Sequence, residues 1–285
     1  MPELPEVESI RRVLLPDIQK RRIEKIISVS PHLFAYPKNE DIASFLCGQI
    51  FSDIQRKGKY LLFIFESGDR LIVHLKMTGR LLILPFEEEE KHTHLLFKLS
   101  NGSFFKFIDT RKLGRMWYIK KGCRYSLLGI EKLGPEPFDD ALCGNYLFEK
   151  LKASKRPIKS ALMDQSVVSG IGNIYSDEVL NASGVLPSRR CCDIQAKEYD
   201  KLAYNIRYVL GFFLEKNLIT KEEYIKTRAK EYKNTPYIKV YGHDGLPCPV
   251  CGSILKKTVI SGRSSCLLFS KLSSSNIVRE SACFF

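Results

Sequence analysis

Long apolar segments are missing from this sequence, and their absence excludes one class of protein. There is no run of about 18 apolar residues, the length that a membrane-spanning helix needs. The opening residues are acidic and Pro-rich rather than basic and apolar, so we expect no signal peptide. No internal repeat is visible. We therefore expect a cytoplasmic protein without a membrane partner.

The sequence also lacks an even number of cysteines that could pair fully in disulfide bonds. The chain has nine cysteines, an odd number. Five of them lie scattered through ordinary segments, at Cys47, Cys123, Cys143, Cys191 and Cys192. Such a set is typical of reduced thiols and argues against a disulfide framework. Only Cys248 and Cys251 have the close spacing of metal ligands.

Acidic residues are outnumbered by basic ones. The 285 residues include 45 Lys and Arg against 32 Asp and Glu, which gives a net charge of +13. This balance says little about the fold, but it favours a polyanionic partner, and nucleic acid before a membrane surface. The chain is long enough for two domains, each with its own core.

Short strand-like runs fill residues 22–120, separated by turn signals. Asn101-Gly102 is the strongest of these signals and is typical of a β-hairpin. The runs predict a two-layer β-sandwich. Leu133–Pro137, with two prolines and a glycine, then interrupts the pattern. After it the apolar spacing becomes helical, which predicts a second, helical domain over about residues 141–225.

The first eight residues bring an amine and carboxylates together. Loss of Met1 would leave Pro2 with a free secondary amine, a group whose usual pKa of about 7.7–8.0 leaves a nucleophilic fraction near neutral pH. Glu3 follows at once, so the parts needed for a Schiff base at a sugar C1′ are adjacent. The alternative is a Pro-rich helix start. The apolar spacing predicts a helix that begins at Pro5 and ends before Pro16.

Several motifs in this sequence resemble those of the formamidopyrimidine-DNA glycosylases, in the same order over residues 1–265. They are Met1-Pro2-Glu3-Leu4-Pro5-Glu6-Val7-Glu8, Lys57-Gly58-Lys59-Tyr60-Leu61, His74-Leu75-Lys76-Met77-Thr78-Gly79, Asp109-Thr110-Arg111-Lys112-Leu113-Gly114, Leu133-Gly134-Pro135-Glu136-Pro137, Gly170-Ile171-Gly172-Asn173-Ile174-Tyr175 and Tyr241-Gly242-His243-Asp244-Gly245-Leu246-Pro247-Cys248. The related endonuclease VIII has Gly at the fourth position, where this chain has Leu4.

The resemblance implies a bifunctional enzyme that removes oxidised purines and then cleaves the strand by β,δ-elimination. It implies that Pro2 attacks C1′ of a base extruded from the duplex, and that Glu3 is the general acid for opening the sugar ring. Lys59 then lies near the phosphate and takes part in β-elimination. Arg263 grips the phosphate beside the lesion and aids δ-elimination.

The resemblance also implies a set of DNA contacts. An extruded base leaves a gap that apolar and Arg side chains commonly fill. The family fills it with three residues, which fall here on Met77, Arg111 and Leu113, the last usually Phe. The remaining DNA-binding residues implied in this way are His74, His92, Lys155 and Asn173. Asn173 opens a helix after a Gly-x-Gly turn, where free N–H groups favour a phosphate.

The C-terminal region departs from the family pattern. Cys248 and Cys251 form the first half of a four-cysteine zinc site, but the second half should fall at Leu268 and Lys271. We weigh three explanations: a hairpin that persists without metal, a site completed by Cys266 and a distant ligand, or a frameshift after Cys266. A two-thiolate set binds zinc poorly, so zinc is a doubtful cofactor here.

A second departure concerns lesion choice. Many family members carry a Gly-rich loop that caps 8-oxoguanine, whereas residues 217–241 here contain no Gly. Formamidopyrimidines or hydantoins are then candidate substrates beside 8-oxoguanine. The alternatives are an endonuclease VIII-like activity on oxidised pyrimidines, a non-catalytic protein that binds damaged DNA, and a general helix–turn–helix regulator. The last explains neither Pro2-Glu3 nor the Met77 and Arg111 pair.

The predicted architecture is an α+β multidomain protein. We assign residues 1–132 to a catalytic β-sandwich with flanking helices, 133–140 to a linker, 141–225 to a helix–two-turn–helix domain, and 226–285 to a degenerate zinc-finger hairpin with a disordered tail. We expect a monomer, associated with the nucleoid, whose partner is double-stranded DNA with oxidised bases or abasic sites.

Overall fold

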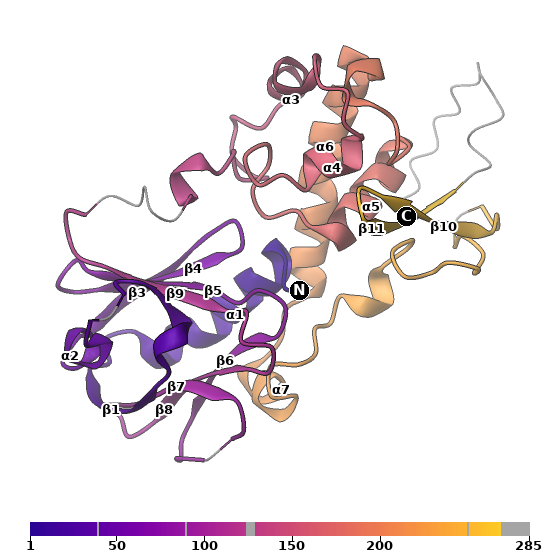
Figure 1. Ribbon diagram of the computed structural model, residues 1–285. Coiled ribbons are helices and arrows are strands. Elements are labelled where there is room, and N and C mark those ends of the chain that lie inside the picture. Colours follow the sequence, from indigo (N-terminus) through magenta and orange to yellow (C-terminus); the bar gives the residue numbers. More distant parts are fainter. Residues whose placement is uncertain (39, 89, 124–128, 250, 269–285) are drawn as a thin grey trace. The chain divides into compact units, whose positions relative to one another are not determined.

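A computed structural model describes residues 1–38, 40–88, 90–123, 129–249 and 251–268. The chain forms two compact units, of which the first comprises Met1–Glu131 and Asn217–Lys233 and the second Lys132–Lys216 with the residues from Asn234 onward. Figure 1 labels their elements. Within the described ranges, no helix is both long and apolar enough to cross a membrane. The predicted disordered tail lies outside the described residues.

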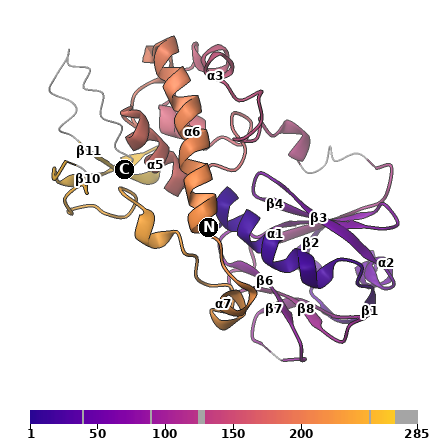
Figure 2. The same cartoon turned by 180° about the vertical axis from the view of Figure 1, so that it is seen from behind.

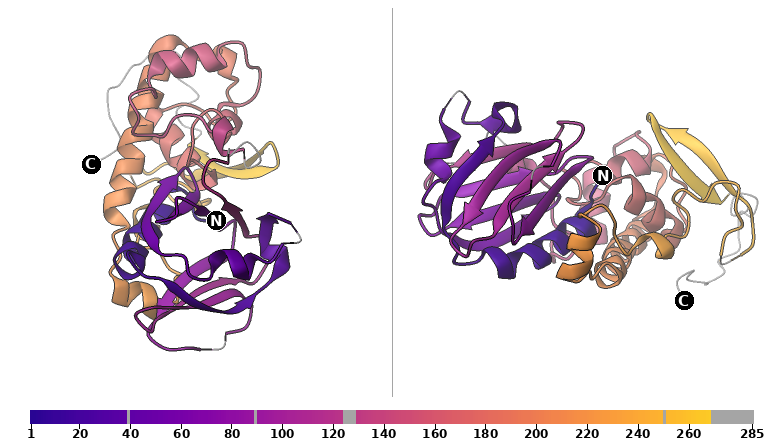
Figure 3. Two further views of the ribbon diagram at one scale, coloured as in Figure 1. Left: turned by 90° about the vertical axis from the view of Figure 1, so that its left-hand side faces the viewer. Right: turned by 90° about the horizontal axis from the view of Figure 1, so that it is seen from below.

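The first unit is the expected two-layer β-sandwich, visible as two stacked sheets in Figure 3. One sheet has the order β1-β7-β8-β6 and the other β2-β9-β5-β4-β3. Its strands are β1 (Ile23–Val29), β2 (Phe34–Tyr36), β3 (Phe51–Lys57), β4 (Tyr60–Phe65), β5 (Arg70–His74), β6 (Gly79–Leu84), β7 (Thr93–Leu99), β8 (Phe104–Asp109) and β9 (Arg115–Ile119). The predicted hairpin at Asn101-Gly102 joins β7 to β8, and Gly102 has φ 82°, as such a turn requires.

The helices of this unit are α1 (Leu4–Ile18), α2 (Ile42–Leu46) and α7 (Lys221–Lys226), with a 3-10 turn at Pro31–Leu33. Helix α1 lies along the sandwich in Figure 2 and packs on β3 and β4 of one sheet and β6 of the other. It was predicted to end before Pro16, which is wrong, because Pro16 lies inside it. Leu14 and Ile18 are fully buried on its inner face, so core packing outweighs the break that proline favours.

The segment Asn217–Lys233 belongs to the sandwich unit, although the sequence analysis divided it between the helical domain and the finger. Tyr224 of α7 is buried, and its hydroxyl donates to the carbonyl of Leu81 at 2.7 Å. Arg228 forms ion pairs with Glu88, at 2.8 Å, and with Glu90. These distant contacts, rather than any local pattern, place the segment on the sandwich.

The second unit is helical with a terminal hairpin. Its helices are α3 (Gly144–Leu151), α4 (Ile158–Leu162), α5 (Asn173–Ser183) and α6 (Ala196–Lys216), with 3-10 turns at Ile130–Lys132 on the boundary, Cys191–Asp193 and Thr235–Tyr237. Its core gathers the inward faces of these helices, including Tyr175 and Phe213. The strands β10 (Leu255–Ile260) and β11 (Arg263–Leu268) pair antiparallel, as the predicted hairpin requires.

Candidate active site and DNA interface

The start of α1 fixes the predicted nucleophile and acid in one place. Pro2 is buried, and Glu3 and Glu6 are 2% and 3% exposed. Glu3 is the N-cap of α1 and forms a capping box with Glu6, whose Oε2 accepts from the Glu3 backbone N–H at 2.7 Å. The capping box therefore holds the Glu3 carboxyl group at the first turn of α1, directly after Pro2 in the chain.

Glu8 anchors the same helix to the sheet. It is 8% exposed and pairs with Arg11 at 2.9 Å, Arg12 at 2.9 Å and Arg56 of β3 at 3.3 Å. Burial alone would raise the pKa of Glu8, but hydrogen bonds from Arg11 and Arg12 hold it below its usual value. Glu8 thus stays ionised at neutral pH, and its bond to Arg56 links α1 to β3.

Lys59 and His74 occupy the neighbouring strand ends of the same sheet. Lys59 is 6% exposed in the two-residue turn between β3 and β4, and Tyr60 pairs with His74 of β5. His74 Nδ1 accepts from the Lys76 backbone N–H at 3.0 Å. Burial and the charges of Lys76 and Lys59 lower the pKa of His74 to about 3, so its ring is neutral in any physiological buffer. A neutral ring holds the turn that leads to Met77.

The three predicted wedge residues lie on adjacent turns and are exposed. Met77 is 48% exposed between β5 and β6, as expected for a surface turn, and Leu113 is 39% exposed between β8 and β9. Arg111 Nη1 lies 3.2 Å from the Met77 sulfur atom. The structure therefore brings Met77 and Arg111 together at one edge of the sandwich.

Asp109 joins these two turns, a role that the sequence analysis did not assign. It is 1% exposed and accepts hydrogen bonds from the Thr78 hydroxyl, from the Arg111 N–H at 3.2 Å and from the Gly114 N–H at 2.7 Å. Its own N–H donates to the carbonyl of His92 at 3.0 Å. One buried carboxylate thus holds the backbone of both turns that carry the predicted wedge residues. The only sequence signal was its place one residue before Thr110-Arg111.

His94, two residues after the predicted His92, is the buried histidine of this region, at 6% exposure. Its Nε2 lies 2.9 Å from the Asp109 carbonyl, which can only accept, so Nε2 carries the proton. Nδ1 then accepts from Ser30 at 3.3 Å. His92 itself is half-buried and has φ 69°. His94 supports the fold beneath the wedge, and His92 keeps an accessible ring.

The second unit carries the other predicted DNA contacts. Lys155 is exposed just before α4, and Asn173 is the first residue of α5. The turn between these helices is held by Gln165, whose side chain accepts from the Gly170 N–H at 2.9 Å and donates to the Ile171 carbonyl at 2.7 Å. The buried Oδ1 of Asn173 has no hydrogen-bond partner in the described structure. The N-terminus of an α-helix carries a partial positive charge, which is why a phosphate contact is predicted at Asn173.

Arg263 stands at the tip of the β10–β11 hairpin. It is exposed and pairs with Ile260 across a two-residue turn, Ser261-Gly262, in which both residues have positive φ. This is the turn type that suits a tight hairpin. The predicted position of Arg263 at a hairpin tip is what the structure shows, and no thiolate is needed to form the turn.

The described cysteines do not fit a zinc site. Cys248 and Cys266 are buried, whereas Cys251 is exposed. Among the described residues, no three His, Cys, Asp or Glu side chains are grouped closely enough to hold a metal ion. Cys248 and Cys266 instead pack with Val240 and Leu255 in a small apolar cluster. Two buried thiols without a third grouped ligand in the described part of the chain are a poor set for zinc, which usually takes four.

DNA glycosylases of the helix–two-turn–helix class combine a β-sandwich, a helical domain and a terminal hairpin in this order. Two family models match the chain: the formamidopyrimidine-DNA glycosylase N-terminal domain over residues 1–116 and the formamidopyrimidine-DNA glycosylase H2TH domain over residues 133–223. The chain belongs to the formamidopyrimidine-DNA glycosylase family, and it is a DNA glycosylase.

Curated and solved relatives agree with this assignment. The formamidopyrimidine-DNA glycosylase of Desulfitobacterium hafniense is 39% identical over 266 residues, which are 93% of this chain and 97% of the relative. A Lactococcus lactis Fpg structure in complex with FAPY-dG-containing DNA has a TM-score of 0.86 at 29% identity and covers 95% of this chain and 100% of its own. Another, with DNA containing an abasic site, has a TM-score of 0.85 at 29% identity, with coverages of 94% and 98%.

Proposed function

We propose that this chain removes oxidised purines from double-stranded DNA and then cleaves the strand at the resulting abasic site. The observation that carries the proposal is the buried pair Pro2 and Glu3 at the start of α1, with Lys59 buried in the same unit. Solved relatives bound to FAPY-dG DNA and to abasic DNA support both halves of the proposal.

In the first step the Pro2 nitrogen, freed by removal of Met1, forms a bond to C1′ of an extruded nucleotide. The bond between C1′ and the base breaks, and the base leaves with a proton. Glu3 gives a proton to the ring oxygen as the sugar opens, which leaves an iminium between Pro2 and C1′. Glu3 is 2% exposed and directly follows Pro2 in the chain, which suits a residue proposed to act on the same sugar.

The iminium acidifies the C2′ proton. Its removal expels the 3′ phosphate in β-elimination, and a second elimination expels the 5′ phosphate. Lys59 is proposed to take part in the first elimination, and the guanidinium of Arg263 is proposed to favour the departing phosphate of the second. Water then hydrolyses the remaining imine and returns the free Pro2 amine.

The proposed lesion preference is argued from the segment Asn217–Lys233, which contains no Gly. This segment is held to the sandwich by Tyr224 and Arg228 and forms a helix, α7, whose N-terminus carries a capping box between Thr220 and Glu223. A Gly-free segment that is anchored in this way is less suited to fold over a flipped base than a Gly-rich loop. We propose that ring-opened formamidopyrimidines and hydantoins are cleaved better than 8-oxoguanine.

The test is a single-turnover cleavage panel on duplexes with a formamidopyrimidine, a hydantoin, 8-oxoguanine or an oxidised pyrimidine. The proposal predicts cleavage in that order, with β,δ-elimination products. Faster cleavage of the oxidised pyrimidine would favour an endonuclease VIII-like enzyme. Tight binding without cleavage of any duplex would favour a non-catalytic protein that binds damaged DNA.

A further inference from the structure

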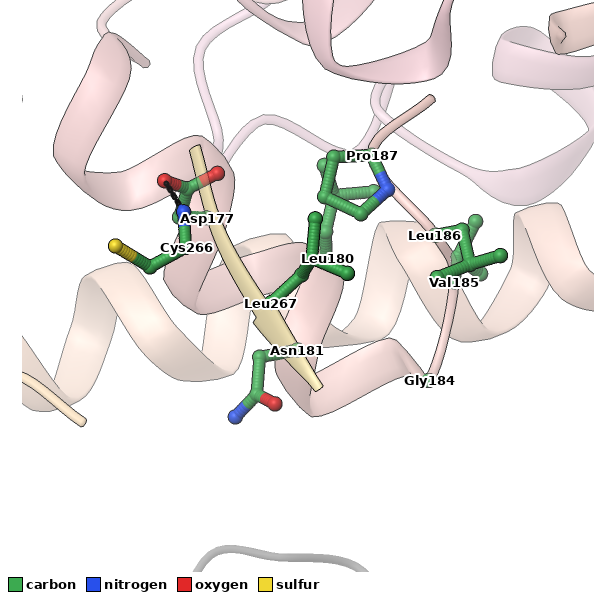
Figure 4. A pocket seen from close by; sticks show the side chains of 9 residues that line it. All are labelled: Asp177, Leu180, Asn181, Gly184, Val185, Leu186, Pro187, Cys266 and Leu267. Atoms are coloured by element: carbon green, nitrogen blue, oxygen red, sulfur yellow. Dashed lines mark hydrogen bonds between the residues drawn. The ribbon is translucent and has the colours of Figure 1, made fainter. Parts of the chain in front are cut away.

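One buried carboxylate ties the hairpin β10–β11 to helix α5. Asp177 is 1% exposed, and its Oδ1 accepts from the Ser265 hydroxyl at 2.6 Å and from Lys159 Nζ at 2.8 Å. Its Oδ2 accepts from the Cys266 backbone N–H at 3.2 Å, the bond drawn in Figure 4. A side-chain bond and a main-chain bond to successive residues of β11 fix the register of that strand against α5.

Helix α4 holds the same strand nearer its tip. Lys159 is 1% exposed, and its ammonium group also donates to the Ser264 carbonyl at 2.8 Å. The hydroxyl of Ser160 donates to that of Ser261, in the hairpin turn, at 2.9 Å. Arg263 lies between these two contacts in the sequence. Its backbone is therefore held from both sides by side chains of α4.

The residue after Asp177 holds the other end of the module. Glu178 is fully buried, and its carboxylate accepts from the N–H groups of Lys239, Val240 and Tyr241 at 3.0, 2.9 and 3.0 Å. These three residues lead into the segment of Cys248. Adjacent carboxylates on one helix thus bind the entry of the module and its last strand.

Apolar packing alone does not set this arrangement. A pocket of about 50 Å³ lies beside Asp177, lined by Leu180 and Asn181 of α5, the 184–187 loop, and Cys266 and Leu267 of β11 (Figure 4). The side chains of β11 thus fill this surface incompletely. Directional bonds to buried charged groups specify a position more narrowly than loose apolar contact does.

We propose that Asp177 and Glu178 position the hairpin, and through it Arg263, in place of a zinc site. Asp177 and Lys159 are positioning residues, since neither lies at the reacting atoms. The inference rests on the proposed role of Arg263 at a DNA phosphate. It explains how a chain without the second cysteine pair keeps a working hairpin.

The test compares the full-length wild type with Asp177→Asn, Ser265→Ala and Arg263→Ala. The matched control is Glu198→Gln, because Glu198 pairs with Arg189 in the same unit and its partners lie outside the hairpin. Asp177→Asn should weaken binding to abasic-site DNA by about ten- to hundredfold. It should also lower the share of δ-elimination product. Ser265→Ala, which removes a single bond, should have a smaller effect, and Glu198→Gln should bind like the wild type.

A double-mutant cycle separates positioning from general damage. If Asp177 acts through Arg263, adding Asp177→Asn to Arg263→Ala should change binding by less than about twofold, because interacting residues are not additive. In the single variant Asp177→Asn, amide hydrogen exchange of residues 255–260 should be faster than in the wild type. Full additivity, or unchanged exchange, would overturn the inference.

A third experiment measures zinc content and the effect of removing zinc. Purified protein should contain much less than one zinc per chain, and dialysis against a chelator should leave DNA binding and hairpin exchange unchanged. Stoichiometric zinc whose removal abolishes both would overturn the inference. If borohydride traps no covalent complex between wild-type protein and DNA, the proposed function is contradicted. The binding and exchange measurements would still decide the positioning role of Asp177.

Discussion

Replacing Asp109 by Asn tests whether one buried carboxylate sets the wedge. The side chain accepts from the Thr78 hydroxyl and from the N–H groups of Arg111 and Gly114. An amide offers one accepting oxygen and turns an NH₂ group toward the remaining donor. Hydrogen bonds to a charged group contribute about 1.5–3 kcal/mol each, so we expect a loss of about 2–4 kcal/mol in the free energy of unfolding.

The functional effect should exceed the loss of stability. The turns that carry Met77 and Arg111 would lose their common anchor, and a small displacement of positioned groups can slow a reaction by an order of magnitude or more. We expect single-turnover excision to fall by about tenfold or more. Cleavage of a pre-formed abasic site, from which no base need be extruded, should fall less.

Asp69→Asn is the matched control. Asp69 accepts from the Tyr118 hydroxyl at 2.5 Å and from the Lys121 N–H at 2.8 Å, away from the wedge turns. Urea unfolding and excision would be measured on both variants. Asp69→Asn should have a lower free energy of unfolding than the wild type. At urea concentrations at which the variant is still folded, its excision rate should equal that of the wild type. If Asp109→Asn unfolds within about 0.5 kcal/mol of the wild type, or if both variants excise equally, the reasoning about Asp109 is refuted.

Two further predictions concern stability. Because the pKa of His74 is lowered from 6.5 to about 3, protonation favours the unfolded chain. The free energy of unfolding should therefore fall as the pH drops from 6.5 to about 3, by at most about 1.4 kcal/mol per pH unit. Urea titrations of His74→Gln at several pH values should lack this contribution to the pH dependence. An equal slope in both proteins would contradict it. Tyr224→Phe removes the bond to Leu81 and should cost about 1–2 kcal/mol and raise hydrogen exchange in α7. Tyr204→Phe, on a side chain 65% exposed, should be neutral; equal losses would refute the role of the buried hydroxyl.

Local patterns predicted much of the fold. Residues 60–65 and 104–108 form β4 and β8 because their apolar runs are bounded by turn residues. β3 has no such run, because the polar residues Ser52, Gln55 and Arg56 interrupt its apolar residues. The sequence pattern also predicted that α1 ends before Pro16, because proline usually breaks a helix. The helix continues to Ile18, whose burial depends on contacts with distant residues that the pattern does not show.

The site shows the same division. Motifs predicted roles for Pro2, Glu3, Arg111 and Arg263, because the proposed chemistry requires those residue types at fixed places. Asp109 and Asp177 were missed as anchors, because a sequence does not show which distant donors surround a carboxylate. Neither does it show that Cys248 and Cys266 share an apolar cluster.

Borohydride trapping tests the central claim most directly. Wild-type protein incubated with abasic or formamidopyrimidine DNA and borohydride should give a covalent complex, and peptide mapping should place the DNA on Pro2. Pro2→Gly, and protein that retains Met1, should trap far less at equal DNA occupancy. Undiminished trapping in those two forms, or a DNA adduct on another residue, would contradict the account.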